Sequence, residues 1–536
     1  MENSHFTNGF ELSVPSTVQT VCYDSTMSAE IGQDFVLPDY QPEVRKLLCV
    51  TPTVQPPSRF LGVGEAELAG NVCFRVLYVG GDGGLYTVTL DAPYTFRIPI
   101  EGDDRVSGER PICLDAELTP RAVTQRLSAP RKLRLSCQLG AHVTLLRDRE
   151  TDLRGEVEAD EKLESSRLCA RALCATGEAL ELTDEIPIGG EGEVRVVGSQ
   201  GTVRINEAQP TEDGVVCQGE VYLKLLLTRE AASEAMDAGE ERVSADGMPE
   251  TVNRRIPFTQ TVEMPQSVGR EGWEAAADGV CTDVAVRVED GRLLCAVTVV
   301  TQAWAQGNER VTFVRDCYAT ARPTECQMRR YPYAQALGCI NGNVTSGGTV
   351  DGGTNAIPAG AIPLDLSGSA VLTGVSAERG RVVLTGDCTY CMLYRTAEGE
   401  LGCGEFQLPL RYELPDSVSA DGTEPGAEVR MRMLGGRVRP DGENNYTVDA
   451  EWAIAGRIYS REQMEAVDEV RAVGGDISAS DGAMVICYPS GEDTLWSVAK
   501  RYRACVRDIV ARNELPGSVD AAAVESLANV AFLMLE

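Results

Sequence analysis

The chain has 536 residues, a formal net charge of −32 and 43% hydrophobic residues. Domains usually contain about 100–200 residues, so we expect three or four of them, each with enough apolar residues for a core. The negative charge repels phosphate groups, which argues against nucleic acid or an anionic membrane surface as the main partner.

The 18 cysteines are scattered from Cys22 to Cys505 and do not form the dense framework of a small secreted protein. Many stand in apolar alternating runs, where a thiol acts as a small hydrophobe. We therefore expect a reducing, cytoplasmic environment. The first residues lack a basic stretch followed by an apolar one, so we expect no secretory export. No apolar run reaches the roughly 18 residues of a membrane-spanning helix, so we expect no integral membrane segment.

One hairpin pattern occurs three times, at 66–100, 215–265 and 382–415. Each copy has an apolar residue two positions before a glycine, then an alternating strand, a turn, and a second strand that reaches a proline. The glycines are Gly70, Gly219 and Gly386. Self-similarity of this kind indicates repeated structural units.

A second alternating element follows each hairpin, at 130–146, 281–305 and 428–460. Period-two alternation is typical of half-buried antiparallel strands. We therefore expect a mainly β chain. It should contain three tandem antiparallel β-sandwich-like domains, at 30–155, 156–325 and 326–475.

Helical signal is sparse before the C-terminal part of the chain. Two stretches carry it, at 42–48 and 461–473, and we expect helices there. The stretch 341–361 is low in charge and rich in Gly, Thr and Asn, which predicts a long loop or linker. A short tether is expected at 474–483.

A small module follows the tether, at 484–536. "VICYP" predicts its first strand and "VAFLML" its last. Between them, apolar residues repeat with helical spacing, which predicts two helices. These residues are Leu495, Val498, Ala499 and Tyr502 in the first helix, and Val506, Ile509 and Val510 in the second. Asp493 or Thr494 can cap the first helix.

The order strand, helix, helix, strand and the run "DTLWSVAKRY" resemble the LysM family, whose modules usually bind cell-wall glycans. That family forms its groove from the loop after the first strand and the loop after the second helix. Glu492 stands where the family has glycine, so we expect altered groove rims. The resemblance implies a partner or glycan groove at Ser490, Gly491, Glu492, Asp493, Thr494, Leu495, Trp496, Asn513, Glu514, Leu515 and Pro516.

Four earlier stretches resemble the SPOCS domain of bacterial spore-coat assembly proteins: "VLPDYQPEVRKLLCVTPTV", "AELAGNVCFRVLY", "SAPRKLRL" and "VTFVRDCYATARPTECQ". Several SPOCS domains followed by one LysM module is the layout of the SipL-like spore morphogenetic proteins. The resemblance implies a non-enzymatic adaptor in the mother-cell cytoplasm, at the forespore surface or spore coat. Its LysM module would bind a coat-basement ATPase of the SpoIVA type.

Other partners and functions stay open at this point. Strand edges of the β domains could pair with other coat proteins or with a second copy of the chain. The alternative function is a protein of the spore cortex or envelope that binds peptidoglycan or a chitin-type glycan. A third hypothesis is a hydrolase that uses acidic residues, although no local pattern singles out a pair of them.

Two features of the C-terminal module allow two interpretations each. Trp496 can pack the first helix against the preceding strand or serve as an aromatic anchor for a partner. Four arginines make the module locally basic, either as a solvated helix face or as a surface that steers an acidic partner. They are Arg501, Arg503, Arg507 and Arg512.

Residues for catalysis are scarce. The two histidines are His5, in a terminus expected to fray, and His142, in an alternating strand. The "CTYC" run places Cys388 and Cys391 three residues apart in a strand, hence on opposite faces, although Cys403 is nearby. "VGGDGGLY" predicts a hairpin turn, not a phosphate loop. We therefore expect no enzyme activity, no cofactor and no metal site.

Overall fold

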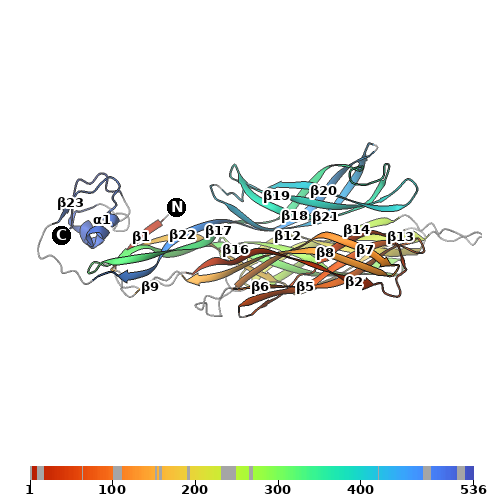
Figure 1. The fold of residues 1–536 in the computed structure, drawn as a ribbon, viewed down its shortest axis with the longest axis horizontal. Coiled ribbons are helices and arrows are strands. Elements are labelled where there is room, and N and C mark those ends of the chain that lie inside the picture. The colour runs from red at the N-terminus through yellow and green to blue at the C-terminus, as the bar shows by residue number, and fades with distance from the viewer. Residues whose placement is uncertain are drawn as a thin grey trace, which may run out of the picture.

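The computed structural model describes residues 3–8, 17–62, 64–100, 112–150, 154–155, 160–189, 193–230, 249–264, 270–420, 422–442, 444–474, 485–515 and 526–535. This described chain is mainly β, with two short helices, α1 (Leu495–Tyr502) and α2 (Val506–Arg512). Within the same residues, no helix has the length and apolar character that crossing a membrane requires. The molecule is elongated, with the β sheets along most of its length and both helices at one end (Figure 1).

One arrangement of six long strands occurs three times in the described chain. In each copy the first, sixth and fifth strands form one sheet, and the second, third and fourth form another. In unit 1 the first sheet contains β2 (Thr17–Val36), β8 (Lys132–Glu150) and β7 (Ile112–Ala129). The second sheet contains β3 (Val44–Val54), β5 (Glu65–Gly80) and β6 (Leu85–Pro99), with the short β4 (Ser58–Leu61) beside β5.

Units 2 and 3 repeat this order. Unit 2 pairs β10 (Glu161–Thr176), β16 (Arg292–Tyr318) and β15 (Glu274–Glu289), and separately β12 (Glu193–Thr211), β13 (Gly214–Glu230) and β14 (Glu250–Glu263). Unit 3 pairs β17 (Thr324–Asp351), β22 (Asn445–Ala472) and β21 (Pro425–Asp441), and separately β18 (Ile362–Glu378), β19 (Arg381–Arg395) and β20 (Leu401–Glu413). Three short strands join the first sheets: β1 (Asn3–Asn8) and β11 (Leu180–Pro187) in unit 2, and β9 (Arg154–Gly155) in unit 3.

The three hairpins predicted from the repeat are confirmed as β5–β6, β13–β14 and β19–β20. Their alternation buries every second side chain, so each pair of sheets encloses a core of its own. In unit 3, for example, the buried rings of Tyr390 and Trp452 meet edge to face, with centroids 5.8 Å apart. The same strand pattern therefore builds three separate hydrophobic cores.

Three predictions about local structure are wrong. Residues 42–48 and 461–473 were expected to be helical, but they contribute to β3 and β22. Glu462 lies opposite Tyr333 in the register of β22 with β17. Pairing with a distant strand thus overrides the local preference of a Glu- and Ala-containing segment. The N-terminus does not simply fray either, because His5 belongs to β1.

The expected linker at 341–361 is also wrong in its first half. Residues 341–351 continue β17 and pair with β22. A Cβ at Gly347 would lie 2.6 Å from the carbonyl oxygen of Val448, so glycine permits this close approach of the two strands. The low-charge composition reflects a strand with restricted space rather than a flexible segment.

The long strands of units 2 and 3 extend beyond their cores. The ends of β10, β16, β17 and β22 pack on one another through Phe313, Tyr331 and Met464, all buried. They form a narrow arm that leads toward the two helices (Figure 1). The arm places the end of β16 next to the C-terminal unit.

A buried ionic cluster joins the three units. Asp115 of unit 1 accepts hydrogen bonds from Arg430 of unit 3 (2.8 Å), and from Gln302 (2.8 Å) and Trp304 (3.1 Å) of unit 2. Burial raises the pKa of Asp115, but the guanidinium groups of Arg430, Arg59 and Arg457 outweigh it and lower the pKa to about 2. We call Asp115, Gln302, Trp304 and Arg430 the central ionic cluster. Because each unit supplies part of this cluster, the three units are interlocked by direct contacts and do not form a linear series of separate domains.

Candidate functional site

The first helix of the C-terminal unit begins with a capping box. The Ser497 N–H donates to the Thr494 hydroxyl (3.2 Å), and the Thr494 N–H donates to the Ser497 hydroxyl (3.0 Å). The predicted apolar face is present, since Leu495, Val498 and Ala499 are fully buried. Tyr502, expected on the same face, is 45% exposed. It lies in the last turn, where the chain leaves the helix through Arg503 in a left-handed conformation.

Asp493, a predicted groove residue, organises the loop before this helix. Its carboxylate accepts from the Ser490 N–H (2.8 Å) and from the Arg501 guanidinium (2.6 Å). The backbone N–H of Ser490 and then Arg501 lower its pKa to about 2. Asp493 therefore fixes the loop and is buried, whereas Ser490, Gly491 and Glu492 are exposed and free to meet a ligand.

Trp496, the candidate anchor, contacts another part of the same chain. Its indole N–H donates to Asp316 of β16 (2.9 Å), and its ring meets Tyr318 edge to face, with centroids 5.1 Å apart. Lys500 donates to the same Asp316 carboxylate (2.6 Å), and the Tyr318 hydroxyl donates to the Ala504 carbonyl (2.8 Å). Trp496 is 5% exposed in this arrangement. The C-terminal unit is thus docked on the end of the arm through its first helix.

The loop after the second helix is held to the closing strand β24 (Leu533–Met534). The Asn513 side chain donates to the carbonyls of Ile509 and Met534, both at 2.8 Å, and accepts from the Met534 N–H (2.8 Å). Glu514 is exposed and Leu515 half-buried. Pro516, also predicted for the groove, lies outside the described residues.

Two of the four arginines of the predicted basic surface have partners within the unit. Arg501 pairs with Asp493, and Arg512 donates to the Leu535 carbonyl (2.7 Å). Arg503 forms the left-handed cap of α1, and Arg507 is exposed at the start of α2. Part of the basic surface therefore stabilises the unit itself.

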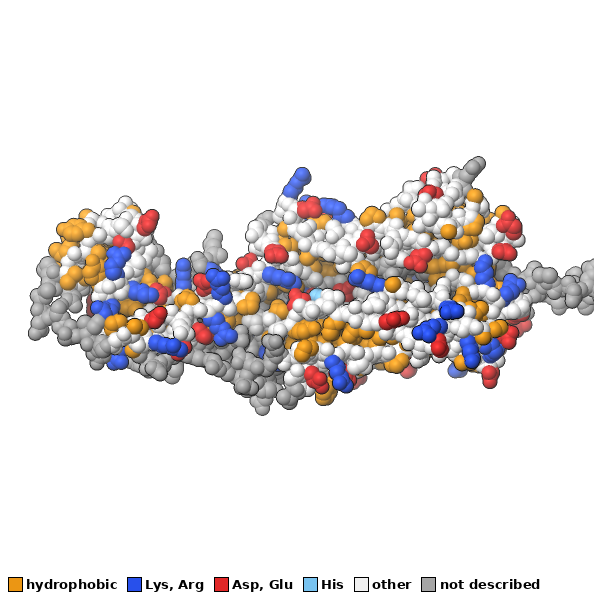
Figure 2. All heavy atoms as spheres, in the orientation of Figure 1, with side chains coloured by type: hydrophobic (Ala, Val, Ile, Leu, Met, Phe, Trp, Pro, Cys, Tyr) orange, Lys and Arg blue, Asp and Glu red, His pale blue; other side chains and the backbone are white. Residues whose placement is uncertain are grey.

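An exposed apolar surface lies on the ribbon of β23 (Ile486–Cys487) and β24. The two strands are antiparallel, with Cys487 opposite Leu533, and both of these side chains point inward and are buried. Their neighbours point outward: Ile486 is 45% exposed, Tyr488 76% and Phe532 50%. Figure 2 shows hydrophobic side chains gathered on the outer end of this unit. We call Ile486, Tyr488 and Phe532 the aromatic ribbon.

Sequence reasoning missed the aromatic ribbon. Alternation around "VICYP" and "VAFLML" carries the signal, because the residues flanking a buried Cys487 or Leu533 must face the other side. The strands are short, so nothing local decides which face is covered. The sequence prediction placed the groove in the two loops instead.

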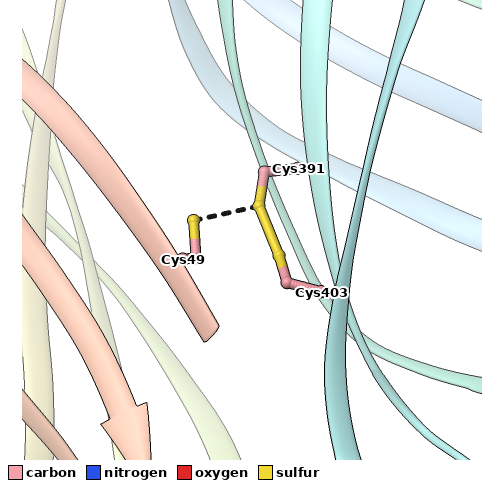
Figure 3. Close-up of side chains that lie close together, drawn as sticks. All are labelled: Cys49, Cys391 and Cys403. Carbon is pink, nitrogen blue, oxygen red and sulfur yellow. Dashed lines mark hydrogen bonds between the residues drawn. A yellow bond between two sulfur atoms is a disulfide. The ribbon is translucent and has the colours of Figure 1, made fainter. Parts of the chain in front are cut away.

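His142 and the cysteines near β19 are residues that the sequence offers for catalysis or metal binding. His142 in β8 shares a hydrogen bond with Asp24 (2.9 Å). As expected, Cys388 is buried in the core of unit 3 while Cys391 points away from it. Cys391 instead lies beside Cys403 and Cys49 of unit 1, with the three sulfur atoms within 4.8 Å of one another (Figure 3).

The fold and the site together define a class of protein: three interlocked antiparallel β units with a small two-helix unit docked at one end. Comparison with known proteins adds no narrower class. No protein-family model, curated protein or solved structure matches the chain.

Proposed function

We propose that the chain is a non-enzymatic assembly adaptor of the spore coat, related to the SipL-like proteins. Its three β units would correspond to SPOCS domains, and its C-terminal unit would be a LysM module. In the proposal, this unit binds a SpoIVA-type ATPase at the forespore surface, in the cytoplasm of the mother cell. The resemblance of the sequence motifs supplies the partner class, and the geometry of the C-terminal unit supplies the binding surface.

The aromatic ribbon is the observation that carries the proposal. Exposed aromatic side chains grouped on one face are typical of protein interfaces, where they contribute a large part of the binding energy. Tyr488 directly follows Cys487 and Phe532 directly precedes Leu533, the two residues that pair across β23 and β24. The surface is at the far end of the molecule, away from the β units (Figure 1). A partner can therefore reach it without displacing another part of the described chain.

The docking of Trp496 changes how the predicted groove can be used. In this arrangement Leu495 and Trp496 are buried, and Asp493 and Asn513 have structural partners. The exposed loop residues Ser490, Gly491 and Glu492 lie between the ribbon and α1 along the chain. We therefore assign the partner contact to the aromatic ribbon and this loop, with Trp496 holding the unit in place.

The β units fit the role of a rigid spacer. The central ionic cluster fixes their relative positions, and the arm carries the C-terminal unit away from them. An adaptor needs this separation if its β units contact other coat proteins while its end contacts the basement layer. Edge strands such as β7 and β20 provide sites for pairing with a further strand.

Capture of a purified SpoIVA-type ATPase by the full chain tests the proposal. Replacement of both Tyr488 and Phe532 by alanine should weaken capture by tenfold or more, because loss of an aromatic anchor costs about 2 kcal/mol or more. Tyr40→Ala is the matched control, since Tyr40 is an 83% exposed aromatic residue in unit 1. Undiminished capture by a chain that lacks residues 476–536 would refute the proposal.

The glycan-binding alternative gives a different result in a parallel experiment. Sedimentation of the full chain with purified peptidoglycan, lost in the same double variant and retained in Tyr40→Ala, would favour it. The adaptor proposal expects no such sedimentation.

A further inference from the structure

Three cysteines from two different units converge at the junction of the β units. Cys49 is on β3 of unit 1, and Cys391 and Cys403 are on the neighbouring strands β19 and β20 of unit 3. The Cys49 sulfur is 2.9 Å from the Cys391 sulfur, and Cys391 forms a disulfide with Cys403 in this structure (Figure 3). All three side chains are half-buried.

A disulfide accounts for two of these cysteines and leaves the third in close contact. The 2.9 Å separation is shorter than the about 3.5–4.0 Å optimum for carbon atoms, although sulfur is the larger atom. One metal ion can contact three sulfur atoms at once, which a disulfide cannot do. With Zn–S bonds of about 2.3 Å at tetrahedral angles, sulfur atoms lie about 3.8 Å apart. All three sulfurs lie within 4.8 Å, so small side-chain movements reach that geometry.

The strand register explains why the two cysteines of unit 3 share a face. Cys391 lies opposite Glu405. Cys403 lies opposite Leu393, which is two residues after Cys391 on β19. Diagonal neighbours of this kind point to one side of a sheet. Cys49 approaches that side from β3, where Lys46 also donates to the Leu401 carbonyl (2.8 Å). The register of β19 and β20 and the packing of β3 against them thus build the cluster.

The surroundings suit a charged metal–thiolate centre. A cavity of about 60 Å³ beside the sulfurs is lined by all three units. Arg75 lines it and donates to Gln200 (2.6 Å), and Lys224 forms an ion pair with Asp365. Three thiolates and one Zn²⁺ carry a net charge of −1, which the guanidinium of Arg75 offsets. A water molecule in the cavity can complete a fourth ligand position.

We propose that the reduced chain binds one Zn²⁺ through Cys49, Cys391 and Cys403, and that this ion fastens unit 1 to unit 3. A dithiol reductant first supplies two electrons and two protons to the Cys391–Cys403 disulfide, which yields two thiols. Zinc then replaces the thiol protons and binds three thiolates, the ligands that soft metal ions prefer. This proposal differs from the expectation of no metal site, and it does not depend on the C-terminal unit.

Zinc content of the full chain provides the test. The protein is reduced, loaded with zinc, freed of excess metal and analysed for bound zinc. Cys22→Ser is the control, because Cys22 is an exposed residue of β2 and does not belong to the cluster. The unaltered chain and Cys22→Ser should each hold about one equivalent more than Cys49→Ser or Cys403→Ser. Equal zinc in the unaltered chain and Cys49→Ser would overturn the proposal.

Two measurements protect the test against misfolded variants. Circular dichroism of each variant shows whether the β structure is intact. In the unaltered chain, cobalt added in place of zinc should give a thiolate-to-cobalt charge-transfer band in the reduced protein. The band should be absent when the Cys391–Cys403 disulfide is intact. A band of equal strength in both forms would contradict the assignment of these ligands.

Discussion

The junction of the three β units and the docking contact of the C-terminal unit are both polar, but they differ in how they are built. In the central ionic cluster, Asp115 and Arg430 are almost fully enclosed, and a Trp304 ring lies 4.7 Å from the Arg430 guanidinium. In the docking contact, Asp316 and Lys500 keep 25% and 40% of their side chains exposed. The first contact is largely shielded from solvent, and the second is partly exposed to it.

This difference indicates different tasks. Separation of the units would expose the buried Trp304 ring and the apolar contact of Cys113 and Leu146 with Ala172, which is costly, so the three β units should stay together. Release of the C-terminal unit exposes one indole ring and returns two partly hydrated charges to water. The docking contact can therefore open at moderate cost while the β units remain intact.

Replacement of Arg430 by alanine should have the largest effect. It removes the main cation beside Asp115 and should lower the free energy of unfolding by about 3–5 kcal/mol. Arg439→Ala is the matched control, since its ion pair with Asp449 is exposed and should contribute less than about 1 kcal/mol. Urea unfolding of both variants measures the difference, and equal midpoints would mean that the cluster does not hold the units together.

The same cluster predicts acid sensitivity. The pKa of Asp115 is lowered from 3.8 to about 2, so its contribution to stability is present above pH 3.8 and is lost as the pH falls toward 2. Thermal unfolding between pH 5 and pH 2 should show this loss in the native chain. In Arg430→Ala the loss should be smaller.

Replacement of Asp316 by alanine should have a smaller and local effect. It removes the acceptor of both Trp496 and Lys500, and hydrogen bonds to a charged group contribute about 1.5–3 kcal/mol. Hydrogen exchange should become faster in α1, while the β units keep their protection. Asp387→Ala, a change of an exposed aspartate in unit 3, should leave α1 unaffected. Unchanged exchange in Asp316→Ala would show that other contacts hold the unit.

Glu161 should make the docking contact weakly dependent on pH. Burial raises its pKa from 4.5 to about 6, hydrogen bonds from Cys505 and Val506 partly oppose this, and the nearby Asp160 and Asp508 add to it. Docking is therefore strongest below pH 4.5 and weakens as the pH rises through 6. The expected change is about 1 kcal/mol, since solvent screens part of the shift.

Replacement of Glu161 by glutamine removes the charge and should flatten this dependence. Hydrogen exchange of α1 at pH 5 and pH 7 compares the two proteins. A native chain whose α1 exchanges no faster at pH 7, after correction for the intrinsic rate, would contradict the prediction.

The sequence was most informative where side chains repeat in a regular pattern. Alternation around Gly70, Gly219 and Gly386 identified the hairpins, and i, i+3, i+4 spacing identified α1 with its Thr494 cap. It failed at 461–473, where the composition favours a helix but β17 is available as a partner strand. Local preferences of this size are small compared with the burial of a 28-residue strand pair.

The candidate sites show the same limit. The sequence located Trp496 in the C-terminal module, yet its partners Asp316 and Tyr318 come from β16, about 180 residues earlier in the chain. Likewise, Cys391 and Cys403 are 12 residues apart on the two strands of one hairpin, but Cys49 joins them from unit 1. Contacts between residues so far apart leave no periodic trace.

Periodicity along the backbone, which depends only on neighbouring residues, determined the mainly β character of this chain, its threefold repetition and the helices at its end. Tertiary structure decided which strand ends form the arm, which face of the C-terminal unit is covered and which cysteines meet. These outcomes depend on the packing of whole sheets, because two surfaces must match in shape and charge before either can be buried.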